Sequence, residues 1–129
     1  MNKIPVAISI VVVAILIGWA LAFSDGKPTR DTASRDNVTV VAGVQYVDIS
    51  ARGGFQPRVS AAKAGLPTVL RFNTANTFDC SASVIIPSLR ISKNLPYTGQ
   101  TEINIGTSTV GTLAGTCAMG MYPFAVEFE

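Results

Sequence analysis

Hydrophobic residues follow two patterns along this chain, one continuous and one alternating. The continuous pattern is an uncharged run over Ile4–Phe23 that is rich in Ile and Val. A helix rises about 1.5 Å per residue, so about 20 residues are needed to cross about 30 Å of hydrocarbon. Trp19 and Phe23, near the end of the run, suit the interfacial belt of a membrane. The run therefore predicts one N-terminal transmembrane helix, with residues 1–23 anchored in the lipid bilayer.

A cleaved signal peptide is the alternative interpretation of this run, because residues 20–22 (Ala-Leu-Ala) resemble a small-x-small cleavage site. The run exceeds a typical signal core of about 7–15 residues, which favours the anchor. Basic residues flank it unequally, with Lys3 before it and three after it, Lys27, Arg30 and Arg35. By the positive-inside rule, the part of the chain that follows is predicted to face the cytoplasm.

A polar stretch, residues 24–37, separates the continuous run from the alternating part of the chain. It contains few apolar residues and carries both charge signs, so we expect a solvated, flexible linker. Residues 38–129 then contain short runs of β-branched and aromatic residues separated by Gly, Pro and Asn, without a convincing helical period. These residues are predicted to form a single domain.

The last predicted strand shows the alternation most clearly. Phe124, Val126 and Phe128 alternate with small or charged residues, which is the pattern of a half-buried strand. Residues 102–105 alternate in the same way, whereas residues 87–96 show neither a clear period nor a strong turn signal. The other predicted strands are Val38–Val41, Val44–Ala51, Arg58–Ala61, Thr68–Thr74, Ser83–Ile86 and Gly111–Gly115. Seven or eight short strands in about 90 residues are typical of an all-β Greek-key sandwich.

Charge and histidine content narrow the possible function. Ten Lys and Arg against eight Asp and Glu give a net charge of only +2. We see no clustered basic footprint, so we expect no nucleic-acid binding. The sequence has no histidine, the most frequent general base and the usual ligand of zinc and type 1 copper sites. We therefore expect a protein that is not an enzyme.

Sulfur is concentrated near the C-terminus. Apart from Met1, the sulfur-containing residues are Cys80, Cys117, Met119 and Met121. If the segment from Cys117 to Met121 is extended, its one thiol and two thioethers project to the same side. Two thiols and two thioethers form a soft donor set that suits Cu(I). The sequence therefore predicts a copper site at these four residues, provided that folding brings Cys80 alongside Cys117.

Charge balance indicates how the copper would be held. One Cu(I) between two thiolates leaves a net negative charge, whereas two Cu(I) ions bridged by them form a neutral cluster that is cheaper to desolvate. Thioethers carry no charge, so a copper ion held partly by Met119 and Met121 should be bound more weakly. Affinity should fall at low pH, because cysteine ligands must lose their protons.

Other interpretations of the sulfur residues remain open. Cys80 and Cys117 could form a disulfide that staples an exported, membrane-anchored β-sandwich with a structural or adhesion role. Trp19 is the sole tryptophan and lies in the apolar run, so it cannot pack on such a disulfide as in immunoglobulin domains. Met119 and Met121 could fill a core, although this does not explain why both lie beside a cysteine.

The region from Val44 to Phe128 resembles a known family. The resemblance is carried by Gly54-Phe55-Gln56-Pro57, Ala64-Gly65-Leu66-Pro67, Phe78-Asp79-Cys80, Ile86-Pro87 and Cys117-Ala118-Met119-Gly120-Met121-Tyr122. These motifs resemble the bacterial cupredoxin-like domains of the EfeO-type group. Within that group they are most similar to the CupA-type membrane-anchored Cu(I) chaperones and to the related metal-binding domains of copper-exporting P-type ATPases.

The resemblance implies a cupredoxin-like β-sandwich with a binuclear Cu(I) site that passes copper to an export ATPase in copper resistance. It implies that Cys80 and Cys117 are the bridging thiolates of the tighter site, and that Met119 and Met121 complete the weaker one. The two histidines with which electron-transfer cupredoxins bind type 1 copper are absent. We therefore expect a membrane-anchored Cu(I) chaperone with a monomeric soluble domain and a copper-exporting P-type ATPase as its partner.

Overall fold

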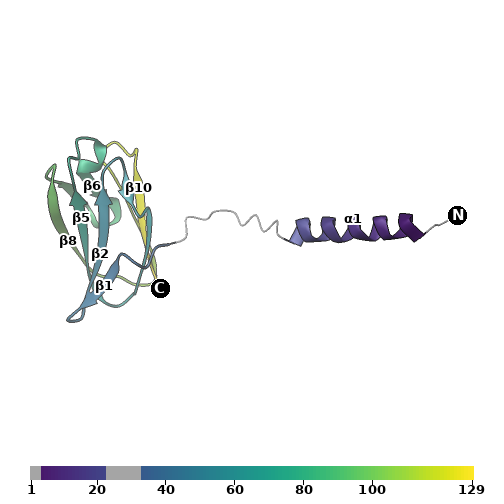
Figure 1. The fold of residues 1–129 in the computed structure, drawn as a ribbon. Helices are drawn as coiled ribbons and strands as arrows, with labels where there is room; N and C mark the ends of the chain where they lie inside the picture. The colour runs from purple at the N-terminus through teal and green to yellow at the C-terminus, as the bar shows by residue number, and fades with distance from the viewer. Residues whose placement is uncertain (1–3, 23–32) are drawn as a thin grey trace. The chain divides into compact units, whose positions relative to one another are not determined.

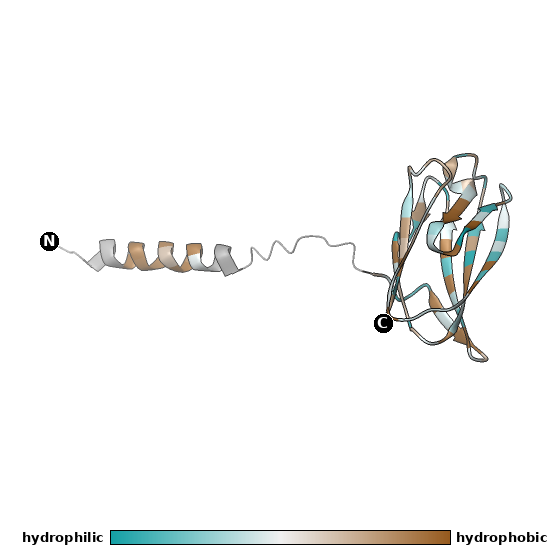
Figure 2. Ribbon diagram, turned by 180° about the vertical axis from the view of Figure 1, so that it is seen from behind, coloured by the Kyte–Doolittle hydropathy of each residue, from teal (hydrophilic) through white to brown (hydrophobic). Residues whose placement is uncertain are grey.

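The chain forms two compact units, Met1–Arg30 and Asp31–Glu129, and the computed structural model describes residues 4–22 and 33–129 of them. The first unit contains helix α1 (Ile4–Ala22), whose described residues are hydrophobic (Figure 2). Within the part of the chain that is described, no helix is long and apolar enough to cross a membrane. The prediction of an N-terminal transmembrane helix is therefore not confirmed, although the segment is helical.

The second unit is a sandwich of two five-stranded sheets (Figure 1). In the first sheet the order is β1-β2-β5-β8, and β3 pairs with β2. Its strands are β1 (Val38–Val41), β2 (Val44–Ala51), β3 (Phe55–Gln56), β5 (Pro67–Thr74) and β8 (Gly99–Thr107). The second sheet has the order β4-β10-β9-β6-β7, with strands β4 (Val59–Ala62), β6 (Ser83–Ile86), β7 (Ile91–Asn94), β9 (Gly111–Thr116) and β10 (Pro123–Phe128). The prediction of an all-β sandwich is confirmed.

Most of the strands lie where the alternation of the sequence predicted them. β1, β2 and β6 have the predicted bounds, and the other predicted strands differ by a few residues at their ends. β3 and β7 were not predicted. β3 has only two residues, and β7 is an edge strand in which Ile91 alone is partly buried, so neither shows an alternating pattern.

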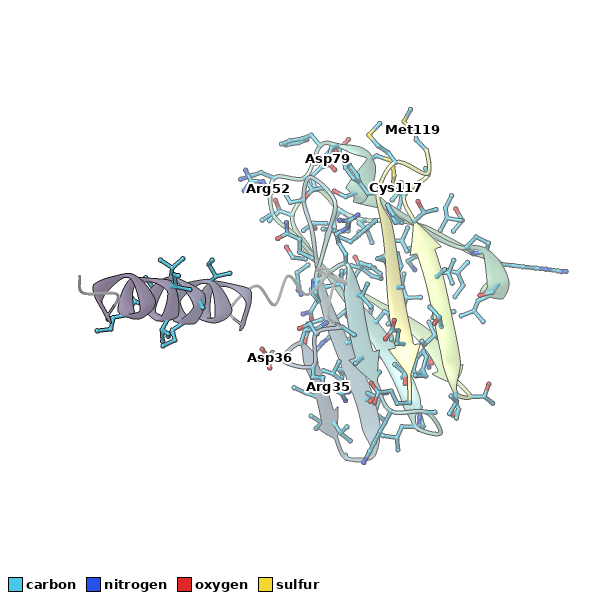
Figure 3. All side chains as sticks on the ribbon, turned by 90° about the vertical axis from the view of Figure 1, so that its right-hand side faces the viewer. Arg35, Asp36, Arg52, Asp79, Cys117 and Met119 are labelled. Carbon is cyan, nitrogen blue, oxygen red and sulfur yellow. A yellow bond between two sulfur atoms is a disulfide. The ribbon has the colours of Figure 1, made fainter. Side chains whose placement is uncertain are left out.

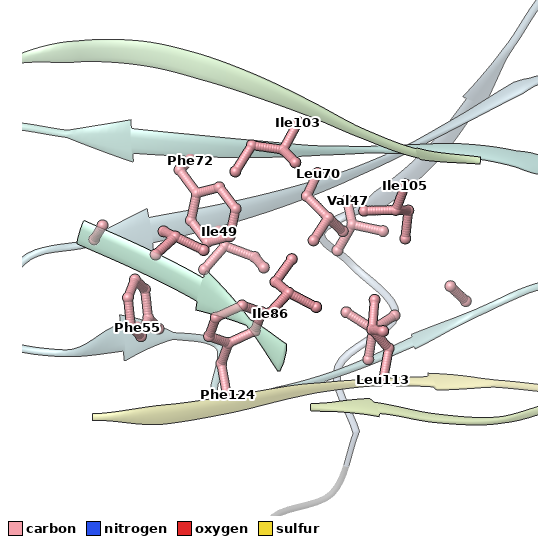
Figure 4. Packing of buried hydrophobic residues seen from close by; sticks show 14 of the residues in the cluster. Val47, Ile49, Phe55, Leu70, Phe72, Ile86, Ile103, Ile105, Leu113 and Phe124 are labelled. Carbon is pink, nitrogen blue, oxygen red and sulfur yellow. The ribbon is translucent and has the colours of Figure 1, made fainter. Parts of the chain in front are cut away.

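The core lies between the two sheets, where every second residue of each inner strand points inward (Figure 4). Its centre is formed by Phe55, Phe72 and Phe124, whose ring centroids lie 4.9 to 5.8 Å apart in edge-to-face contacts. Gly115 of β9 faces this cluster, and a Cβ atom there would lie 2.2 Å from the ring of Phe124. Only glycine fits at this position, so the hairpin of β9 and β10 packs closely against the core.

The residues just before β1 lie along the second sheet. The Ser34 N–H donates to the Val59 carbonyl at 2.9 Å, and the Ala61 N–H donates to the Ser34 carbonyl at 2.8 Å. The Asn37 side chain donates to Ser60 Oγ and to the Asp48 carbonyl. These contacts attach residues 34–37 to the sandwich. Most of the predicted linker, residues 24–32, lies outside the described residues.

Candidate functional site

The segment from Cys117 to Met121 is a turn between β9 and β10. The Gly120 N–H donates to the Cys117 carbonyl at 3.0 Å, and the Cys117 N–H donates to the Tyr122 carbonyl at 3.2 Å. Gly120 has a φ of 71°, in the left-handed region that favours glycine. The segment is therefore not extended, and the condition under which its thiol and two thioethers would project to the same side is not met.

Cys80 and Cys117 lie together as the predicted site requires, but they are joined in a disulfide. Their Sγ atoms are bonded to each other, and their Cα atoms are 5.6 Å apart. Cys80 begins the 3-10 helix η1 (Cys80–Ala82), which leads directly into β6, and Cys117 directly follows β9. β6 and β9 are neighbours, paired at Ile85 and Thr116. The fold therefore brings the two sulfur atoms together, and their bond is the one that the alternative interpretation expected.

The two cysteines differ in their exposure to solvent. The side chain of Cys117 is fully buried and packs in the core, whereas Cys80 is half-buried. Two hydrogen bonds join the turn to the segment around Cys80. The Met119 N–H donates to Cys80 Sγ at 3.4 Å, and the Ala118 N–H donates to Ser83 Oγ at 3.0 Å. The position of the turn is therefore coupled to Cys80.

Both methionines of the turn are on the surface. Met119 is 78% exposed and Met121 is 60% exposed. Figure 3 shows Met119 at the same end of the sandwich as Cys117 and Asp79, with its side chain pointing outward. The alternative in which these methionines fill a core is therefore wrong. Their thioethers lie at the surface, in the turn that begins at Cys117.

An exposed pair of aromatic rings lies beside the disulfide. Phe78 is 73% exposed and Tyr97 is 62% exposed, and their ring centroids are 4.9 Å apart. Together with Cys80 and Met119 they line an open pocket of about 510 Å³. Sequence reasoning did not assign these two rings to the site. The available signal was the position of Phe78 next to Asp79 and Cys80, whereas Tyr97 is 17 residues from Cys80 and gives no local signal.

Asp79 links the backbone just after Cys80 to the segment at Gly53. Its carboxylate accepts hydrogen bonds from the Ser81 hydroxyl, from the Ser81 N–H at 2.8 Å and from the Gly53 N–H at 2.7 Å. These bonds, first of all the one from the Ser81 hydroxyl, lower the pKa of Asp79, and the charge of Arg52 contributes in the same direction. Asp79 therefore stays ionised at neutral pH and caps η1.

The candidate metal ligands at this end of the sandwich are sulfur atoms. Over residues 4–22 and 33–129, no group of three or more His, Cys, Asp or Glu side chains is placed to hold a metal ion. The soft donors at this end are the sulfur atoms of Cys80, Cys117, Met119 and Met121.

Comparison with known proteins identifies the family. The sequence model of the cupredoxin-like domain matches residues 12–126. No curated protein matches the sequence. The finer similarity to EfeO-type and CupA-type proteins stays a prediction, because the match extends to cupredoxin-like domains in general.

Two solved structures share the fold. One is the metal-binding domain of the Cu(I)-exporting P-type ATPase CopA of Streptococcus pneumoniae D39, solved with Cu(I). It is 18% identical, with a TM-score of 0.65, covering 71% of this chain and 92% of that chain. The other is a copper-binding protein in its apo form, 19% identical, with a TM-score of 0.69, covering 77% of this chain and 99% of that chain. With its fold and the family match in agreement, this chain belongs to the cupredoxin-like domain family.

Proposed function

We propose that this protein is a Cu(I) carrier that binds copper through Cys80, Cys117, Met119 and Met121 and passes it to a copper-exporting P-type ATPase. The proposal is carried by one observation: Cys80, Cys117, Met119 and Met121 lie at one end of the sandwich. Cys80 is bonded to Cys117, the Met119 N–H donates to Cys80, and Met121 ends the same turn. Figure 3 shows Cys117 and Met119 at this end. Both structures described above are of copper-binding proteins or domains, which supports copper as the cargo. Carriage by ligand exchange needs no enzymatic turnover.

The donor set supports Cu(I) over other metals. Thiolates and thioethers are soft ligands that suit Cu(I), and the sequence offers no histidine for zinc or type 1 copper. Two Cu(I) ions bridged by two thiolates form a neutral cluster, which is less costly to place beside the apolar core than a charged one. We therefore expect two ions per reduced chain.

Copper uptake depends on the redox state of the cysteines. In the disulfide, neither sulfur atom is a thiolate, and the thiolate is the form that binds metal. The carrier state is therefore the reduced protein. Opening the bond between the two Sγ atoms requires two electrons and two protons, and it leaves both thiols at the site.

Burial supports different roles for the two kinds of ligand. Cys117 is fully buried, so a partner cannot reach its sulfur without displacing other groups. Met119 and Met121 are exposed, so the copper that they share is open to attack by the thiols of a partner. We expect the thioether-bound ion to leave first and the thiolate-bound ion to remain.

The proposal includes attachment to the bilayer through the uncharged run Ile4–Phe23, with the sandwich facing the cytoplasm. The flanking charges support this orientation, whereas a disulfide is more common in oxidising compartments. A membrane-impermeant maleimide tests the orientation. It is added to intact cells that express the full chain and, for comparison, to lysed cells. A sandwich that faces the cytoplasm, with reduced thiols, is labelled only after lysis.

An anaerobic competition titration against a Cu(I) chelator tests the proposal on the reduced full chain. The wild type should bind about two Cu(I) ions. Replacing both methionines, Met119→Leu with Met121→Leu, keeps apolar side chains but removes the thioethers and should abolish only the weaker ion. Cys117→Ser should abolish nearly all binding. Val110→Ala is the matched control, since Val110 is 76% exposed and has no donor atom.

Two outcomes of this titration contradict the proposal. Binding of a single ion that is unaffected by the methionine substitutions would exclude the two-site arrangement. An absence of Cu(I) uptake by fully reduced wild type would exclude copper carriage altogether.

The observed disulfide favours a second candidate function, a stapled β-sandwich with a structural or adhesion role. In that case the bond should persist in the cell. Thiol counting in cells that express the full chain separates the two functions. The cells are lysed in acid, which quenches thiol exchange, and the free thiols of the protein are then counted. A structural staple shows no free thiols under any growth condition, whereas a Cu(I) carrier shows two in copper-stressed cells.

A further inference from the structure

The Cys80–Cys117 disulfide presents its two sulfur-bearing side chains unequally to solvent. Cys117 is fully buried in the core cluster, whereas Cys80 is half-buried and lines the open pocket described above. Cys117 does not line that pocket. A reagent that approaches from solvent through the pocket therefore meets Cys80 first.

The pocket beside Cys80 has the size of a small-molecule site. Its volume is about 510 Å³, within the range of about 300–1,000 Å³ that is typical of ligand pockets. The walls combine the apolar surfaces of Phe78, Leu95 and Tyr97 with the polar side chain of Asn94. Such walls can accommodate a short thiol-bearing molecule that also carries amide groups.

We propose that this pocket is a thiol–disulfide exchange site, at which a low-molecular-weight thiol opens the disulfide by attack on Cys80. The thiolate of the small molecule forms a new S–S bond to Cys80 Sγ. The bond between Cys80 and Cys117 breaks, and its electron pair leaves on Cys117 Sγ, which takes a proton from solvent. A second molecule of thiolate attacks the sulfur of the bound small molecule and forms a small-molecule disulfide. The electron pair of the broken bond leaves on Cys80 Sγ, which takes a proton from solvent and becomes a free thiol.

The backbone around Cys80 supports the second step of the exchange. In that step the electron pair leaves on Cys80 Sγ, and the Met119 N–H that donates to this sulfur stabilises the leaving thiolate. The Ala118 N–H bond to Ser83 Oγ holds the turn in place beside it. Because Cys117 is shielded, we expect the exchange to be slow compared with that of an exposed disulfide.

The exchange converts the oxidised protein into the dithiol state. The chemical step needs no copper, and only its consequence, formation of the copper-binding state, rests on the proposed function. The proposed exchange and the proposed copper binding can therefore fail separately. A copper-free experiment tests the exchange, and the titration of chemically reduced protein tests copper binding.

The experiment uses the oxidised, copper-free full chain and glutathione as the probe. The reaction is stopped at intervals with acid, free thiols are alkylated, and tryptic peptides are analysed by mass spectrometry. Trypsin separates the two cysteines, because Arg71 and Arg90 flank Cys80 and no Lys or Arg follows Lys93. We expect glutathione on Cys80 and alkylation on Cys117, in about tenfold excess over the opposite arrangement. Glutathione mainly on Cys117, or equally on both cysteines, would overturn the proposal.

A substitution in the pocket tests its role independently. Asn94→Trp places a large ring at the pocket wall and should slow the exchange about fivefold or more, since access to the disulfide limits the rate. The matched control is Ser92→Trp, which alters an exposed residue of the same edge strand that does not line this pocket. Reaction with an equal rate in both variants would show that the thiol does not enter through this pocket.

Discussion

The turn Cys117–Met121 and the aromatic centre of the core are only three residues apart in sequence, at Met121 and Phe124, yet they differ completely in packing. Phe55, Phe72 and Phe124 are almost fully buried and touch one another, whereas Met119 and Met121 are mostly exposed. Cys117 belongs to the first region by burial and to the second by sequence. The difference indicates that the fold determines where the two cysteines lie, while it leaves the thioethers available to a partner.

Truncation of a ring in the core should have the largest effect on stability. Phe124→Ala removes a ring that contacts Phe55 and Phe72, so it should lower the free energy of unfolding by about 3–5 kcal/mol. Phe78→Ala is the same chemical change at a residue that is 73% exposed, and it should cost less than about 1 kcal/mol. Denaturant unfolding of the oxidised proteins measures both. Equal losses would mean that Phe78 is packed as firmly as the core.

Reduction of the disulfide should have the next largest effect. The bond closes a loop with a sequence separation of 37, for which loop-closure entropy gives up to about 4 kcal/mol. Thermal unfolding with and without reductant measures this loss, and Cu(I) should restore part of it by binding the folded dithiol form.

The double substitution Met119→Leu with Met121→Leu, in the oxidised protein, should change the free energy of unfolding by less than about 0.5 kcal/mol. A larger loss would contradict the view that the thioethers are held only by the turn.

The fold could be predicted from sequence where strands have one buried face. β2 alternates between buried and less buried positions over its whole length, and its predicted bounds agree with the structure. β7 was missed because only Ile91 is partly buried. The parallel pairing of β2 with β5 and of β4 with β10 was not predicted, since it joins segments that are far apart in sequence and leaves no local pattern.

The candidate site was predicted less completely than the fold. The juxtaposition of Cys80 with Cys117 follows from adjacent strands β6 and β9, and the soft donor set is visible in the sequence. The sequence analysis considered an extended Cys117–Met121 segment only as a condition, and the structure forms a turn there, for which Gly120 was the available signal. Whether the cysteines are thiols or a disulfide depends on redox conditions, so residue order could not decide it.

Overpacking beside the core should have a moderate effect. Gly115→Ala places a methyl group against the ring of Phe124, and the displacement should cost about 1–3 kcal/mol. Ala114→Val adds carbon atoms to the exposed neighbour in the same strand and should change stability by less than about 0.5 kcal/mol. Urea unfolding of the oxidised proteins compares them. Because Gly115 lies two residues before Cys117, thiol counting in Gly115→Ala also shows whether the disulfide still forms. Equal stability of the two variants would mean that Phe124 can move away without cost.

A small effect is expected at Asp79, which links the segment around the disulfide to Gly53. Its pKa is lowered in the folded protein, chiefly by the hydrogen bond from the Ser81 hydroxyl, so its stabilisation is present above the unfolded-state pKa and is lost as pH falls through the folded-state value. Asp79→Asn should lower the free energy of unfolding by less than about 1 kcal/mol at neutral pH, because the side chain is exposed. The difference from wild type should begin to shrink as the pH falls below about 4, near the unfolded-state pKa, and should shrink further until the pH is below the lowered folded-state pKa. Denaturant unfolding of oxidised wild type and Asp79→Asn, from neutral pH to below about pH 4, measures this difference in the free energy of unfolding. A difference that stays constant with pH would mean that the carboxylate charge contributes nothing and that hydrogen-bond geometry alone holds Cys80 in place.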